Sequence, residues 1–183
     1  MDRTDALALV RKKVKNKNLV NHMVAVEAVM GALASHLGEE TEMWRLAGLL
    51  HDLDYDETLD HPDRHGQVSA AILEELGLPC AIVQAVRAHN PALGVDRESP
   101  MDKALYCADP VTGLIVASAL IHPRKKLGAI DARFVVKRFG EKHFARGANR
   151  EQIRACEELG LKLEEFLDIS VRAMQEISSE LGL

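Results

Sequence analysis

Apolar residues recur at intervals of three and four along most of this chain, which is the period of an amphipathic helix. The clearest case is the segment 18–37, which Gly38 ends in the manner of a helix C-terminus. Its apolar stripe follows a 3-4-3-4 spacing and consists of Met23, Val26, Met30, Leu33 and Leu37. No segment shows the alternation of apolar and polar residues that is typical of a half-buried strand. The pattern therefore predicts an all-α chain.

The expected helices are bounded by Gly, Pro and capping residues at the breaks in this period. They lie at residues 2–15, 18–37, 41–53, 67–76, 79–89, 101–121, 131–139, 149–159 and 163–181. We expect Asp2 or Thr4 to cap the first helix and Thr41 to cap the third. The polar stretch DYDETLDHPDRHG, which ends at Gly66, has no period and predicts a loop. Pro110 predicts a kink, or a new helix with Asp109 as its N-cap.

Composition and charge narrow the class of protein. Of 183 residues, 47% are hydrophobic and only 4% are aromatic, which favours a packed helical core over a sheet. The net charge is −5 and the pI is about 5.9, which argues against a long nucleic acid as partner. The short basic cluster Arg124-Lys125-Lys126 is interpreted as a solvated helix end.

The cysteines and the apolar runs bear on the cellular compartment. Cys80, Cys107 and Cys156 are odd in number and show no CxxC spacing, which indicates neither a disulfide framework nor a cysteine zinc site. Cys80 and Cys107 stand among apolar residues and are expected in the core. We find no secretory signal and no apolar run near the ~20 residues of a membrane helix. We therefore expect a cytoplasmic protein with no membrane contact.

Six side chains that can bind a metal ion stand out against this helical background. Five of them fall in phase with apolar stripes, as Asp109 does with Leu105 and Val116, and Asp52 directly follows His51. A carboxylate on an apolar stripe is costly unless it is paired or ligated. The six residues are His22, His51, Asp52, His65, His89 and Asp109.

Each of these residues has an ordinary explanation when it is taken alone. A lone histidine on an apolar face is most often a hydrogen-bonded core residue, Asp109 can be an N-cap, and His51-Asp52 can simply end a helix. Taken together, they predict one metal site. Mixed imidazole and carboxylate ligands suit iron, manganese, cobalt, nickel or zinc, with magnesium also open. Six such groups can hold one or two divalent ions.

The order His22, His51-Asp52, Asp109 resembles the HD-domain superfamily of metal-dependent phosphohydrolases. The likeness covers roughly residues 19–120 and is strongest to the HDIG-related predicted hydrolases. It is carried by four strings of sequence. They are LAGLLHDLDYD, HGQVSAAILEELGLP, IVQAVRAHN and KALYCADPVTGLIVA.

The resemblance implies an all-α HD-domain bundle with a metal site at its centre. It implies His22, His51, Asp52 and Asp109 on one ion, and His65 and His89 on a second, with Asp52 bridging the two. On this basis we expect residues 1–125 to form the HD domain and residues 126–183 to form a C-terminal helical extension packed on the same domain.

The sequence departs from the family pattern in two places. Leu53-Asp54 replaces the Ile-Gly of the named motif, a change that we expect to be neutral for the metal. Pro110 stands where many relatives have an acid, a change that we expect to alter the pocket wall.

The predicted activity is metal-dependent hydrolysis of a phosphate ester or anhydride by metal-activated water, with Asp52 as the catalytic residue. The expected partner is a small phosphorylated substrate, such as a nucleotide or small phosphoester, and a homodimer is left open. Arg64, Arg87 and Lys103 are candidates for binding phosphate because each is near a ligand in sequence, although a solvated side chain is the commoner explanation for each.

Two other functions are compatible with the same ligands. The resemblance implies that HD-fold di-iron oxygenases share the set of four His and two Asp. A non-catalytic ligand-binding module could also keep such a site, although the complete set of six argues against it.

Overall fold

The computed structural model describes residues 1–183 and contains helices but no strand, which confirms the all-α prediction. Three short 3-10 helices, η1 (Pro91–Leu93), η2 (Leu127–Ala129) and η3 (Ala155–Leu159), lie between the α-helices. The α-helices are α1 (Arg3–Lys13), α2 (Lys17–Leu37), α3 (Thr41–Leu50), α4 (Tyr55–Thr58), α5 (Gln67–Glu75), α6 (Cys80–Ala88), α7 (Pro100–Ile121), α8 (Ala132–Phe139), α9 (Arg150–Arg154), α10 (Leu163–Glu176) and α11 (Ser178–Leu181).

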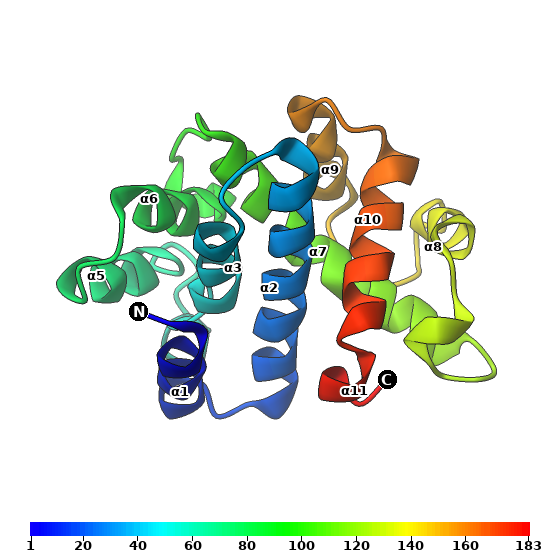
Figure 1. Ribbon diagram of the computed structural model, residues 1–183, viewed down its shortest axis with the longest axis horizontal. Helices are drawn as coiled ribbons and strands as arrows, with labels where there is room; N and C mark the ends of the chain where they lie inside the picture. Colours follow the sequence, from blue (N-terminus) through cyan, green and yellow to red (C-terminus); the bar gives the residue numbers. More distant parts are fainter.

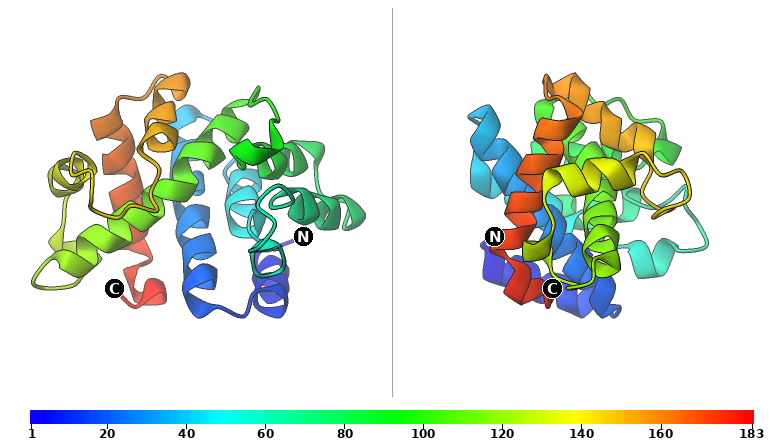
Figure 2. Two further views of the ribbon diagram at one scale, coloured as in Figure 1. Left: turned by 180° about the vertical axis from the view of Figure 1, so that it is seen from behind. Right: turned by 90° about the vertical axis from the view of Figure 1, so that its right-hand side faces the viewer.

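Helix α2 stands at the centre of the molecule. It is flanked by α3 on one side and by α10 on the other, and α7 crosses behind them as a diagonal (Figure 1). Helices α5 and α6 form the flank beyond α3, and α8 forms the opposite flank. The view from behind shows α7 crossing in front of α2 (Figure 2). This arrangement gives α2, α3 and α7 a shared interior.

The interior is one apolar cluster that includes the fully buried side chains of Trp44, Leu105 and Ile115. Gly48 allows α2 and α3 to approach closely, because a Cβ at this position would lie only 2.8 Å from the carbonyl oxygen of Val26. The close approach matters for function, since both helices carry residues of the predicted site.

Helix α7 runs unbroken through Pro110. Its N-cap is Ser99, which forms a capping box with Asp102, so the alternative of a new helix with Asp109 as N-cap is wrong. A proline removes only one backbone donor, and the buried neighbours of Pro110 hold the helix across that gap. Asp109 therefore lies in the middle of a helix.

Helix α7 is also the one helix that is long and apolar enough to cross a membrane by length and composition. This corrects the expectation that the chain has no such run. In the fold, α7 packs in the core, and 56% of its apolar window is buried.

Three local predictions differ from the structure. The N-cap of α3 is Glu40, because its longer carboxylate reaches the N–H groups of Glu42 and Met43. The loop 54–66 contains the short helix α4. Cys80 is exposed at the start of α6, whereas Cys107 and Cys156 are buried.

The last third of the chain, residues 126–183, packs on the same core. Helix α10 lies against α2. The side chain of Arg150 binds the backbone of the segment between α8 and α9. Its guanidinium donates hydrogen bonds to the carbonyl oxygens of Ala145 and Ala148, at 3.0 and 2.6 Å. The division at residue 125 stays a prediction.

Candidate metal centre

Six side chains from separate parts of the chain meet where the ends of α3 and α6 approach α2 and α7. They are the six that the sequence singled out: His22 on α2, His51 and Asp52 after α3, His65 before α5, His89 after α6, and Asp109 on α7. The cluster therefore joins residues that are distant in the sequence, with 87 positions from His22 to Asp109.

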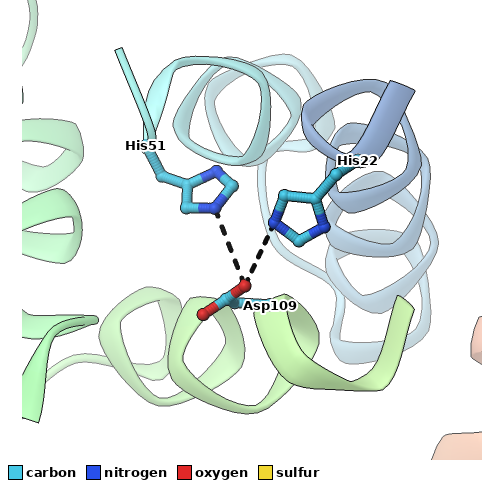
Figure 3. A group of neighbouring side chains, drawn as sticks. All are labelled: His22, His51 and Asp109. Carbon is cyan, nitrogen blue, oxygen red and sulfur yellow. Dashed lines mark ion pairs between the residues drawn. The ribbon is translucent and has the colours of Figure 1, made fainter. Parts of the chain in front are cut away.

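One end of the cluster is formed by His22, His51 and Asp109 (Figure 3). The Oδ1 atom of Asp109 lies 3.1 Å from Nε2 of His22 and 3.9 Å from Nε2 of His51. The three side chains come from α2, the end of α3, and α7, and they point toward one another. This end is partly open, because His22 and Asp109 keep 22% and 29% of their side-chain surface exposed.

Asp52 occupies the middle of the cluster. Its Oδ1 atom lies 3.3 Å from Nε2 of His51 and 3.2 Å from Nε2 of His65. The same atom lies 3.6 Å from Nε2 of His89, whereas Oδ2 lies 3.7 Å from Nε2 of His22. One carboxylate thus faces all four imidazoles.

Two of the imidazoles are oriented by the backbone of their own helix. The Nδ1–H of His51 donates to the carbonyl oxygen of Gly48 at 2.8 Å, and that of His89 donates to the carbonyl oxygen of Val86 at 2.5 Å. Both carbonyl oxygens lie in the last turn of their helix, α3 or α6, where such groups lack a backbone partner within the helix. These bonds fix the tautomer in which the Nε2 lone pair faces the cluster.

The other two imidazoles are oriented by side chains. The Nδ1 of His22 lies 2.9 Å from Oγ1 of Thr112, and the Thr112 hydroxyl in turn donates to the carbonyl oxygen of Asp109. The Nδ1 of His65 lies 2.9 Å from Oδ1 of Asp54. All four histidines are therefore held by Nδ1 and present Nε2 to the same place.

Asp54 also shapes the loop that carries His65. Its Oδ2 atom accepts hydrogen bonds from the N–H groups of Gly66 and Ser69, both at 2.8 Å. Gly66 has φ +82°, and a Cβ there would lie 3.1 Å from Cε1 of His89, so only glycine lets this loop close onto the histidine. Asp54, which stands in place of the motif's glycine, thus contacts a candidate ligand, and its effect on the metal stays a prediction. Sequence reasoning missed this role because the bond spans a loop with no period.

The donor set fits a divalent metal ion. In each of the groups His22-His51-Asp109 and His51-Asp52-His89, the ligand atoms all lie within 4.8 Å of one another. Ligands at about 2.0–2.2 Å from one ion are roughly 3 to 4 Å apart, which is close to the separations seen here. In addition, Nε2 of His51 is fully buried and has no hydrogen-bond partner. A bound cation would satisfy that atom.

Comparison with protein families agrees with this geometry. Residues 19–120, more than half of the chain, match the family model described as HD domain. The chain belongs to the HD domain family. The match confirms the predicted family, a superfamily of metal-dependent phosphohydrolases, and it includes all six clustered residues.

Several relatives of this HD domain protein are named ribonucleases. This chain is 30% identical over 99 residues to Ribonuclease Y 2 of Levilactobacillus brevis, a match that covers 53% of this chain and 18% of that protein. It is 29% identical over 96 residues to Ribonuclease Y of Aquifex aeolicus, covering 51% and 16% of the two chains. It is 36% identical over 76 residues to Ribonuclease Y of Thermosipho melanesiensis, covering 40% and 14%. The matched region is less than a fifth of each relative. No solved structure shows a significant match.

These relatives contradict the expected partner. They are named for action on RNA, so the prediction of a small phosphorylated substrate and no long nucleic acid is wrong. The prediction rested on the net charge of −5, which is a sum over the whole chain and conceals its distribution. Residues 11–17, for example, include five Lys or Arg and no acid.

Burial and neighbouring charges set the protonation of the HD domain's histidines. Burial lowers the pKa of His51 to about 4, so this imidazole is neutral at neutral pH. Burial also opposes the charge on His65, but its hydrogen bonds to Asp52 and Asp54 raise the pKa of His65 to about 10. Although burial favours the neutral acid, the surrounding histidines hold the pKa of Asp52 well below its usual range. A metal ion bound by His65 would therefore displace a proton.

The three candidate phosphate-binding side chains make no polar contact with the cluster. Arg64 is exposed on the loop just before His65. Arg87 pairs with Glu74 at 2.9 Å, and Lys103 borders a hollow that Glu158 also lines, at the start of α7. Their part in substrate binding stays a prediction.

A cavity of about 470 Å³ lies beside the cluster, and His22 is the cluster residue that lines it. Its other walls include Asn21, Thr112, Val116 and Leu181. The C-terminal helix α11 thus contributes to the wall, a role that the sequence did not indicate.

Proposed function

We propose that this HD domain protein hydrolyses phosphodiester bonds of RNA with divalent metal ions bound at the cluster. One observation carries the proposal. Four histidines, held through Nδ1 by four different acceptors, direct Nε2 toward the carboxylates of Asp52 and Asp109. Such oriented donors are suited to a metal, and they leave no uncommitted nucleophilic side chain among them.

Each residue has a defined role in this proposal. His22, His51, Asp52 and Asp109 would hold one ion, and His65 and His89, with Asp52 shared, would hold a second. Iron, manganese, cobalt, nickel or zinc suits these ligands, and magnesium is the harder alternative. Ions held there would supply a water of lowered pKa and positive charge for the oxygens of a phosphoester.

The protein's own groups support hydrolysis without a covalent enzyme intermediate. The hydroxyl of Thr112, which contacts His22, already donates to the carbonyl oxygen of Asp109. The nearest thiol along α7, Cys107, is buried and directed at the carbonyl oxygen of Ala104. Asp52 is the residue we expect to matter most, because its carboxylate faces every histidine of the cluster.

RNA is favoured over other phosphodiesters by the named activity of the relatives. Identities of 29 to 36% over less than a fifth of those proteins support a shared reaction class, and the RNA substrate is our proposal for this chain.

The proposal is tested with chelator-treated protein reloaded with Mn²⁺, Fe²⁺, Co²⁺, Ni²⁺, Zn²⁺ or Mg²⁺. Hydrolysis of labelled single-stranded RNA and of bis(p-nitrophenyl) phosphate is measured for wild type, Asp52→Asn and the control Asp60→Asn, an exposed acid of the same loop region. We expect wild type and the control to hydrolyse both compounds and Asp52→Asn to hydrolyse neither.

A specific result would replace this reading. If no ion supports hydrolysis of any phosphodiester, while reduced iron-loaded protein consumes oxygen with an organic substrate, the oxygenase reading takes its place.

A further inference from the structure

The end of α1 and the turn that leads into α2 concentrate positive charge in an acidic chain. We call residues 11–17 the basic turn; its cationic residues are Arg11, Lys12, Lys13, Lys15 and Lys17. No acid occurs between Asp5 and Glu27, and all five cationic side chains are exposed. Five like charges within seven residues repel one another, and a bound anion would relieve that repulsion.

The cationic groups of the basic turn are free of carboxylate partners. The ion pairs that lysine or arginine forms in this protein use other residues, namely Arg3, Arg45, Arg87, Arg138 and Arg172. The one acid that contacts the turn, Asp56, accepts a hydrogen bond from the backbone N–H of Lys15. The side chain of Val14 in this turn is buried in the apolar core. The turn is thus fixed in place while its charges face solvent.

The basic turn lies next to the cavity that His22 lines. A hollow of about 430 Å³ is lined by Arg11, Lys15, Lys17 and Asn21. Asn21 also lines the cavity that opens on His22, so the two hollows share a wall residue. One hollow is therefore cationic, and the adjoining cavity is lined by the candidate ligand His22.

We infer that the basic turn binds the phosphate backbone of single-stranded RNA and positions the strand for entry past Asn21 to the cluster. The inference rests on the proposed function for its choice of RNA. Lysine and arginine side chains bind successive phosphates without reading sequence, and a groove that tracks the backbone is the usual form of such a surface. Beyond Asn21, the apolar walls at Val116 and Leu181 offer a surface for a base rather than for phosphate.

The chain offers a matched control for this surface. The cluster Arg124-Lys125-Lys126 follows the end of α7, is exposed, and lines neither hollow. The test variant is Arg11→Gln/Lys15→Gln/Lys17→Gln, and the control is Arg124→Gln/Lys125→Gln/Lys126→Gln. Each removes one arginine and two lysines from the surface, and circular dichroism with thermal unfolding checks that both remain folded.

Binding and turnover are measured separately on metal-loaded protein. Binding uses fluorescence anisotropy with a short labelled single strand carrying 2′-O-methyl phosphorothioate linkages, checked to be intact afterwards. We expect the turn variant to lose at least tenfold in affinity. Its salt dependence should flatten by roughly 0.7 in log–log slope for each cation removed. The control should lose about twofold or less. Hydrolysis of bis(p-nitrophenyl) phosphate, which is too small to reach the turn, should be unchanged in both variants.

Several outcomes would overturn the inference. They are wild-type affinity in the turn variant, equal losses in the two triple variants, absence of strand binding by wild type, and equal affinity of wild type for polyglutamate of the same charge. Failure of the proposed function is a different result, namely no hydrolysis of any phosphodiester by wild type, and the binding measurements do not depend on it.

Discussion

Asp54 holds His65 by a 2.9 Å contact between its Oδ1 atom and the imidazole Nδ1, and it does so from a buried position next to the cluster. We predict that Asp54→Asn weakens binding of one metal ion about 10- to 100-fold, because it removes the charged acceptor that orients this ligand. Calorimetric titration with Mn²⁺ measures the change. Asp60→Asn, an exposed acid on the same loop, is the control. Unchanged affinity in Asp54→Asn would show that the Asp54 carboxylate is not needed to orient a metal ligand.

Removal of a central ligand should empty the site. We predict that His51→Ala and Asp52→Ala each lose bound metal and unfold at lower temperature, since the ion links helices that are distant in sequence. Elemental analysis of the purified variants gives the occupancy, with His36→Ala, a surface histidine near Glu165, as control. Full occupancy in both cluster variants would eliminate the metal assignment.

The second ion has its own test. His65 and His89 face each other with 3.1 Å between their Nε2 atoms, a close approach that a shared cation would stabilise. We predict two ions per chain in wild type at saturating Mn²⁺ or Fe²⁺, and one in His65→Ala/His89→Ala. The double variant His61→Ala/His143→Ala, which removes exposed histidines, should keep two. A ratio of one in wild type would leave His65 and His89 as core or substrate-binding residues.

The start of α7 should depend on its capping box. The Oδ2 atom of Asp102 accepts from the N–H groups of Glu98 and Ser99 and is buried. We predict that Asp102→Ala lowers the free energy of unfolding by about 1–3 kcal/mol, because two backbone donors lose their partner. Ser99→Ala should cost about 1 kcal/mol. Urea unfolding at fixed metal loading measures both, against the exposed Asp96→Ala. Equal stability of Asp102→Ala and this control would contradict the prediction.

Thiol reactivity should separate the three cysteines. Burial raises the pKa of Cys156 to about 11 and that of Cys107 well above its usual value, whereas Cys80 is exposed. Only the thiolate reacts rapidly, and a raised pKa leaves little of it at pH 8. We predict one fast thiol per native chain with a disulfide reagent, absent in Cys80→Ser, and three after denaturation. A fast phase that survives in Cys80→Ser would show that the core opens locally.

Much of the fold was predictable from the sequence because the signals are local. The period of the apolar residues and the breaks at Gly38 and Asn90-Pro91 lie within one or two helical turns, so they predict the helices within a few residues. Five of the six cluster residues were also predictable, because polar groups on apolar stripes require a partner, and Asp52 was found through its place directly after His51. Local competition between caps explains the errors at Thr41 and Asp109, where a longer carboxylate at Glu40 and an earlier capping box at Ser99 prevail.

The sequence by itself thus determined an all-helical chain with six candidate metal ligands, five of them in phase with its core. Only the tertiary structure decided which group orients each histidine, as Asp54 orients His65 across a loop, and which hollows adjoin, as the hollow at the basic turn and the cavity at His22 do at Asn21. The physical reason is range: helix formation depends on contacts within a few residues, whereas these relationships arise when segments distant in sequence pack together and no repeating pattern records them.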